Sequence, residues 1–382
     1  MNVKRFVEID SLRVIASILV FISHFSYYFL EGSLSSAGHD VAGMTGRFAV
    51  NIFFGVSGYL VAHSLSQKDA LSLFYIKRAI RVLIPYNVAY FFMGFLMVAL
   101  GAVNIAYFSG APITNIILNS GEYSKLIPIM LGMDGILNIY FDREYYFLTG
   151  EWFIGAIIFM YMLSPLLYKV IDTKLSNALL FMILVILFST IMYYQVDGRI
   201  KVPFWFFLAR LPELYLGMML YRYQHLVDLY KKETSLVVIS ILAIYLVITL
   251  SLFPNPFLAD CILPVSPSSW FFSLPLVTLT FIVVRHLNIL LDCSAFNSLA
   301  KISYPFMLIQ HAIINIYLPH LPTKEFSIFG YFFVLLTLMT VTYILSIRIK
   351  KIAAPIEKFL LKKASLLYAT PNKNDIASAN KL

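Results

Sequence analysis

The first apolar segment of the chain, residues 9–30, contains three ionisable side chains, Asp10, Arg13 and His24. His24 is the best suited of them to proton transfer, because a neutral imidazole costs far less to bury than a carboxylate and titrates near neutral pH. Arg13 and His24 are 11 residues apart, which on an α-helix is about three turns and about 16 Å along the axis. Both side chains therefore lie on nearly one face, where Asp10 can pair with the guanidinium of Arg13.

A structural role explains the same residues equally well. An arginine near a membrane interface can extend its charged end toward the lipid headgroups. A histidine inside a bundle can hydrogen-bond a neighbouring helix. Spacing alone favours neither the catalytic nor the structural explanation of Arg13 and His24.

A basic cluster, Lys77, Arg78 and Arg81, lies in the sequence FYIKRAIRVLIPY. Because Arg78 and Arg81 are three residues apart, both guanidiniums can face one ligand from a helix. Paired arginines suit bidentate binding of a phosphate group. Taken alone, however, the cluster is more typical of cations that only mark the cytoplasmic side of a membrane.

Three further places carry candidate residues. Glu151 and Trp152 begin an apolar segment, where they can bind a sugar hydroxyl and stack on its ring or simply mark the membrane interface. Arg210 and Glu213 lie three residues apart within another apolar segment and are expected to pair with each other, as a structural pair or at a cavity. His311 is a weaker candidate than His24 for proton transfer.

Composition sets the class of protein. Of 382 residues, 60% are hydrophobic and 13% are charged, whereas soluble domains carry about 25% charged residues. This predicts an all-α, polytopic membrane protein and excludes a soluble enzyme, a nucleic-acid-binding domain, a β-barrel porin and a secreted disulfide scaffold. No HExxH or CxxC spacing occurs, so no metal site is predicted, and no Walker loop for ATP is present.

Hydropathy predicts about ten transmembrane helices, because an apolar stretch of about 20 residues crosses the hydrocarbon core of a bilayer. With the N-terminus in the cytoplasm, 21 of the 29 lysines and arginines fall on the cytoplasmic side, which predicts that both termini are cytoplasmic. We expect a membrane domain at 1–364 and a short polar tail at 365–382. The predicted spans are 9–30, 48–66, 82–102, 150–168, 177–195, 204–221, 235–253, 269–286, 303–319 and 327–347.

Several motifs, taken in order, resemble the acyltransferase-3 family of integral membrane acyltransferases, from about Ile9 to the last span. They are IDSLRVIASILVFISHF, FFGVSGYL, RAIR, WFIGAIIFMYMLSP, RLPELYLGMML and SYPFMLIQH. Trp152, Tyr161 and Pro165 stand at the spacing of the family's fourth-helix signature. The chain departs from the family at two positions. Ile157 stands where many members have a glutamate, and Gln310 stands where the ninth-helix histidine usually lies, one residue before His311.

The resemblance implies a membrane O-acyltransferase of the cytoplasmic (inner or plasma) membrane that modifies exported or surface carbohydrate. Its co-substrate would be acetyl-CoA from the cytoplasm, with no permanently bound cofactor, and its acceptor a lipid-linked polysaccharide. Arg78 and Arg81, with Lys77, would bind the donor, and Arg13 would guide it toward His24. His24 would then act as a general base or carry the acyl group transiently. The remaining candidates, from Glu151 to His311, would bind the acceptor or support the site.

A polysaccharide transporter or exporter component is the alternative function. Ten spans with buried charges such as Arg210 and Glu213 are broadly typical of transporters. The paired arginine and histidine of the first span have no rationale in transport, which favours the acyltransferase.

Overall fold

The described part of the chain is entirely helical. The computed structural model describes residues 6–29, 36–102, 126–133, 137, 152–196, 206–252, 270–287, 292–318, 321 and 326–368, and no strand occurs among them. This confirms the predicted all-α class.

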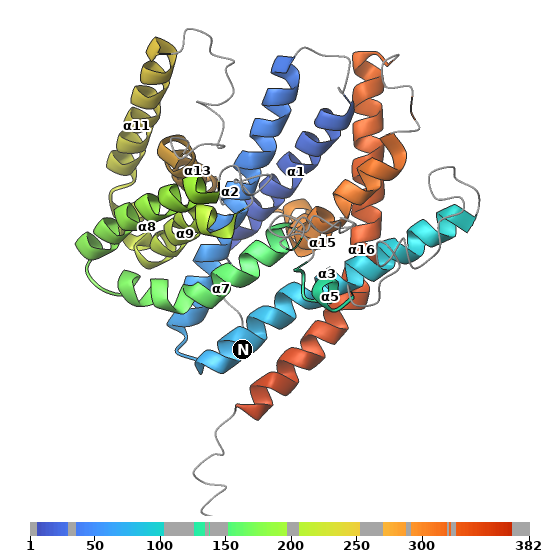
Figure 1. Cartoon of the computed structure of the whole chain (residues 1–382), viewed down its shortest axis with the longest axis horizontal. Coiled ribbons are helices and arrows are strands. Elements are labelled where there is room, and N and C mark those ends of the chain that lie inside the picture. The colour runs from blue at the N-terminus through green and yellow to red at the C-terminus, as the bar shows by residue number, and fades with distance from the viewer. Residues whose placement is uncertain are drawn as a thin grey trace, which may run out of the picture.

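The helices follow one another through the bundle shown in Figure 1. They are α1 (Val7–Phe29), α2 (Ser36–Ser66), α3 (Leu71–Ala102), α5 (Leu126–Met130), α7 (Trp152–Ile171), α8 (Leu175–Val196), the 3-10 helix η3 (Phe207–Arg210), α9 (Leu211–Arg222), α10 (Gln224–Leu229), α11 (Lys231–Leu252), α13 (Trp270–His286), α15 (Ser294–Tyr317) and α16 (Ile328–Leu367).

Six helices of the described residues are long and apolar enough to cross a membrane: α1, α2, α3, α7, α8 and α16. The other predicted spans coincide with α9, α11, α13 and α15, which do not meet that criterion over their described residues. In α15 the reason is visible in its sequence, because Lys301, Ser303, Gln310 and His311 lower its hydropathy. Lys301 lines the cavity, and the other three residues contact α1.

Two glycines allow the backbones of α2 and α9 to come into direct contact. A Cβ atom on Gly58 of α2 would collide with the carbonyl oxygen of Leu214, and one on Gly217 of α9 would collide with the backbone of Gly55. Such close crossings are typical of small residues at helix interfaces in membranes. The α2–α9 pair forms the centre of the bundle, and α1 packs against the other side of α2.

Helices α1 and α15 run parallel and in register. The Ser17 hydroxyl donates to the carbonyl oxygen of Ser303 at 3.2 Å, and His24 and Gln310 are hydrogen-bonded at 2.8 Å. Both pairs are separated by 286 residues, so the two helices keep one offset over about two turns. Helix α16 runs the other way, since Tyr331 near its start bonds the hydroxyl of Ser26 near the end of α1 at 2.7 Å.

Helix α16 is longer than a bilayer is thick. Its 40 residues span about 60 Å, against about 30 Å for a hydrocarbon core. It continues 20 residues beyond the predicted span end at 347, past Pro355, and the last part projects beyond the other helices in Figure 1. Lys350 and Glu357 lie in this continuation.

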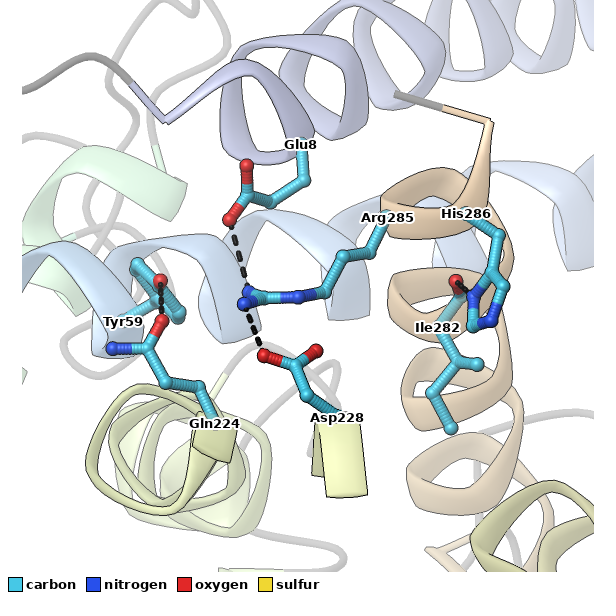
Figure 2. A network of polar contacts seen from close by, with 7 residues as sticks. All are labelled: Glu8, Tyr59, Gln224, Asp228, Ile282, Arg285 and His286. Atoms are coloured by element: carbon cyan, nitrogen blue, oxygen red, sulfur yellow. Dashed lines mark hydrogen bonds and ion pairs between the residues drawn. The ribbon is translucent and has the colours of Figure 1, made fainter. Parts of the chain in front are cut away.

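An ion-pair network joins α1, α10 and α13 where α1 begins. The guanidinium of Arg285 contacts the carboxylate of Glu8 at 3.1 Å and that of Asp228 at 2.7 Å, as Figure 2 shows. Beside it, the Tyr59 hydroxyl donates to the side-chain oxygen of Gln224 at 3.0 Å. The Glu8 side chain is only 9% exposed, so it depends on Arg285 for its counter-charge.

We expect Arg285→Ala to destabilise the protein by about 2 kcal/mol or more, because it leaves the buried carboxylate of Glu8 without its cation. The matched control is Arg222→Ala, which breaks a pair with Asp172 whose side chains are 42% and 57% exposed. That loss should stay below about 1 kcal/mol. Denaturant and thermal unfolding in detergent micelles measure both, and equal losses for the two variants would contradict the role given to Arg285.

Candidate functional site

A cavity of about 620 Å³ opens among α1, α2, α3, α7, α15 and α16. This volume lies in the range typical of sites for cofactor-sized ligands. Its walls bring together six of the residues singled out from sequence: Asp10, Arg13, Lys77, Arg78, Arg81 and Tyr161.

The residues that line the cavity fall into a charged group and an apolar group, and several helices contribute residues to each group. The charged mouth lies where α1, α3 and α15 begin and where α2 ends. It comprises Asp10, Arg13, His63, Gln67, Asp69, Lys77, Arg78, Arg81, Asn297, Lys301, Lys350 and Glu357. The apolar end lies deeper along the same helices and comprises Phe53, Val56, Pro85, Phe153, Ile157 and Met307. Along α2 the two parts are far apart, since Ser64 near the mouth and Phe53 are 11 residues apart, about 16 Å of helix.

Arg78 is the most buried cation of the mouth, with 7% of it exposed. One terminal nitrogen donates to the carbonyl oxygen of Leu60, and the guanidinium lies over the rings of Tyr161 and Phe74 at 5.5 and 5.7 Å. These contacts fix the plane of the guanidinium. Its Nε atom is buried and has no hydrogen-bond partner among the described residues. Arg78 is thus held in one orientation in the mouth, and its Nε–H remains available as a hydrogen-bond donor.

The cations of the mouth differ in how far they are already neutralised. Three have carboxylate partners: Lys77 with Asp69 at 2.6 Å, Lys350 with Glu357 at 3.7 Å and Arg13 with Asp10 at 4.0 Å. Arg78, Arg81 and Lys301 have no carboxylate partner among the described residues, and Arg81 and Lys301 are exposed. The positive charge that remains for an anionic ligand therefore belongs chiefly to these three residues.

His24 forms a separate cluster with Gln310 and His311 of α15. The Gln310 side chain, 1% exposed, is hydrogen-bonded to Nδ1 of His24 at 2.8 Å, and the two imidazole rings lie 4.9 Å apart. The amide can donate from Nε2 or, turned over, accept the Nδ1 proton at Oε1, which leaves Nε2 of His24 as the basic nitrogen. In either orientation Gln310 fixes the tautomer and the plane of the ring.

The cluster lies close to the apolar end of the cavity. Met307 lines that end and precedes Gln310 by three residues on α15, which is about 4.5 Å of helix. Arg13, in the mouth, and His24, in the cluster, both lie on the continuous helix α1. The predicted alignment of these two residues therefore connects the mouth with the cluster.

The remaining candidates lie elsewhere. Arg210 and Glu213 form a fully buried ion pair at 3.2 Å, and Arg210 also contacts the Asn51 side chain at 3.5 Å. The Trp152 ring packs against Phe54, with centroids 6.1 Å apart. None of these residues lines the cavity. Glu151 lies outside the described residues.

Sequence reasoning missed the contributions of α15 and α16 to the mouth. Lys301 and Lys350 counted only toward membrane orientation, and Asn297 and Glu357 stood in no motif. Tyr304 belongs to the SYPFMLIQH motif but was not named as a candidate. A heptad spacing of polar residues on α15, Ser303 and Gln310, was the available signal for the face that meets α1. Among the described residues, no group of three or more His, Cys, Asp or Glu side chains is placed to hold a metal ion.

Comparison with known proteins identifies the family. A family model described as an acyltransferase domain matches residues 6–347. The chain belongs to the acyltransferase-3 family. A 94-residue part is 35% identical to a protein named O-acetyl transferase from Shigella phage Sf6, and this match covers 23% of the chain and 27% of the phage protein. No solved structure matches the chain significantly. The matched range thus contains the His24 cluster and all of the cavity lining except Lys350 and Glu357.

Gln310→Leu should lower the rate of acyl transfer by roughly 10–100-fold, by analogy with the cost of removing residues that orient metal-bound histidines. The optimum pH of transfer should also move, because the tautomer of His24 is no longer fixed. The control is Ser17→Ala, which removes the hydroxyl that donates the other α1–α15 hydrogen bond two turns away. A Gln310→Leu protein with the rate and pH profile of Ser17→Ala would refute the positioning role.

Proposed function

We propose that the protein is an integral membrane O-acyltransferase that transfers acetyl from cytoplasmic acetyl-CoA to a hydroxyl of a lipid-linked or exported surface polysaccharide. One observation carries the proposal: a cavity has a cationic mouth and an apolar end, and Met307 at that end lies one helical turn from Gln310, which is hydrogen-bonded to His24. That arrangement suits a ligand with phosphates at one end and a reactive thioester at the other.

The donor fits the cavity by charge and by length. The phosphates of coenzyme A would bind Arg78, Arg81 and Lys301, whose charge is not neutralised by carboxylates of the described residues. The lining of α15 runs from Asn297 to Met307, ten residues, or about 15 Å. An extended pantetheine arm reaches about 15–20 Å, so it delivers the thioester to the apolar end.

His24 would accept the proton of the acceptor hydroxyl. The hydroxyl oxygen then bonds to the acyl carbon, the carbon–sulfur bond breaks, and the coenzyme A thiolate leaves with the proton that His24 took. In the second route, His24 itself carries the acyl group before the hydroxyl receives it. Glu151, Trp152, Arg210, Glu213 and His311 are proposed to support the site or the acceptor.

The proposed topology has about ten membrane helices and both termini in the cytoplasm, in the inner or plasma membrane. Contacts at one end of the bundle support it, since the start of α1 meets the end of α13 and the end of α7 meets the end of α9. The bias of 21 of 29 cations toward that side supports the same orientation. The mouth of the cavity then faces the cytoplasm, where acetyl-CoA is present.

His24→Ala and Arg13→Ala should each reduce the acetyl ester content of the surface glycan to that of a strain lacking the gene, with protein levels unchanged. Mass spectrometry of the glycan measures this. Unmodified polymer should still reach the surface in all these strains. Loss of surface polymer would instead favour a polysaccharide exporter, and unchanged ester content in both variants would refute the mechanism.

Arg81→Gln should raise KM for acetyl-CoA about tenfold at nearly constant kcat, because it removes ground-state binding of a phosphate. Lys77→Gln is the matched control, and its effect should stay below about threefold since Asp69 already neutralises the ammonium group at 2.6 Å. Steady-state assays of purified protein with glycan-bearing membranes distinguish the two. Equal effects would contradict the assignment of the free charge to Arg81.

A further inference from the structure

We infer that the apolar end of the cavity is an acyl-group pocket that admits a short uncharged acyl chain and rejects an acyl chain bearing a carboxylate. Ile157, Phe53 and Met307 are its specificity-determining residues. The inference rests on the proposed function, because it names the part of the donor that occupies this end of the cavity.

The position of the pocket follows from the order of residues along each wall. On α2 the lining changes from His63 to Val56 and Phe53, and on α15 it changes from Asn297 and Lys301 to Met307. Every wall with residues at both levels thus changes in the same direction. A donor held by its phosphates at the mouth must place the opposite end, its acyl group, in the apolar part.

Aromatic rings pack against one another at the apolar end. Phe53 and Phe153 contact each other with ring centroids 5.8 Å apart, and Phe153 also contacts Phe54 at 4.9 Å. Packed aromatic rings leave little space for extension of an acyl chain beyond them. The geometry therefore limits the length of the acyl group as well as its charge.

Ile157 is central to the charge selection. It lines the cavity one turn beyond Phe153 and one turn before Tyr161 on α7, between Phe153 and the mouth. No charged side chain is among the residues of the apolar end, and beside them Ser57, next to Val56, supplies one hydroxyl. The carboxylate of a succinyl group placed there would lose most of its hydration without gaining a cation. An acetyl or propionyl group presents only methyl or ethyl carbon to the same walls.

The test compares donors with purified protein and glycan-bearing membranes, using acetyl-, propionyl-, butyryl- and succinyl-CoA. For the wild type, kcat/KM with propionyl-CoA should be within about tenfold of the acetyl-CoA value, and with succinyl-CoA at least about 100-fold lower. Ile157→Ala should raise the butyryl-to-acetyl ratio by about tenfold. Ile157→Lys should raise the succinyl-to-acetyl ratio by at least about tenfold, because it supplies the missing cation.

Ile158→Ala is the matched control, since Ile158 neighbours Ile157 on α7 but does not line the cavity. It should leave the donor ratios unchanged. Efficient transfer of succinyl by the wild type, or identical ratios for Ile157→Ala and Ile158→Ala, would overturn the inference while leaving the acyltransferase intact. Absence of transfer from every donor would overturn the proposed function instead. Displacement of labelled acetyl-CoA by the other donors then tests the pocket alone, and equal displacement from the two alanine variants would refute it.

Discussion

The structure depends on one constraint: a charge inside a bundle surrounded by lipid must have a counter-charge or access to water. The described helices meet it in two ways. Glu8 and Glu213, both buried, are paired with Arg285 and Arg210. Arg78 is buried but lines a cavity, with one nitrogen unpartnered among the described residues. The paired charges hold helices together, and the unpaired ones at the mouth are available to a ligand.

The parallel pairing of α1 and α15 determines where the chemistry can occur. Two contacts at one offset, Ser17 with Ser303 and His24 with Gln310, fix the register of the helices. That register brings Arg13 level with the part of α15 that begins the cavity, and it brings His24 one turn beyond Met307, where the cavity ends. A slip of one residue would turn Gln310 away from His24, since each residue rotates a helix by about 100°. The polarity of α15 thus reflects its place in the site.

Local periodicity made part of this predictable. The helical spacing of Arg13 and His24, the placement of Arg78 and Arg81 on one helix, and the pairing of Arg210 with Glu213 are properties of single segments, and the structure contains all three. The roles of Gln310, Lys301 and Lys350 depend on which helices become neighbours, which no single segment encodes. Hydropathy located the helices well. The mean hydropathy of α15 nevertheless falls below that of the six membrane-length helices, because polar residues that face a site lower it as much as residues that face water.

The division of the cavity into a charged and an apolar part fits the chemistry of the thioester donor that we propose. Its phosphates need cations and tolerate water, so they would lie at the exposed mouth beside Arg81 and Lys301. The thioester carbon must meet an acceptor oxygen before it meets water, and walls such as Phe153 and Ile157 exclude water from that end. A membrane bundle favours this change from polar to apolar lining, because residues farther along its helices lie deeper in an apolar medium. Under the proposed function, the same fold that restricts charge would thereby separate donor binding from acyl transfer.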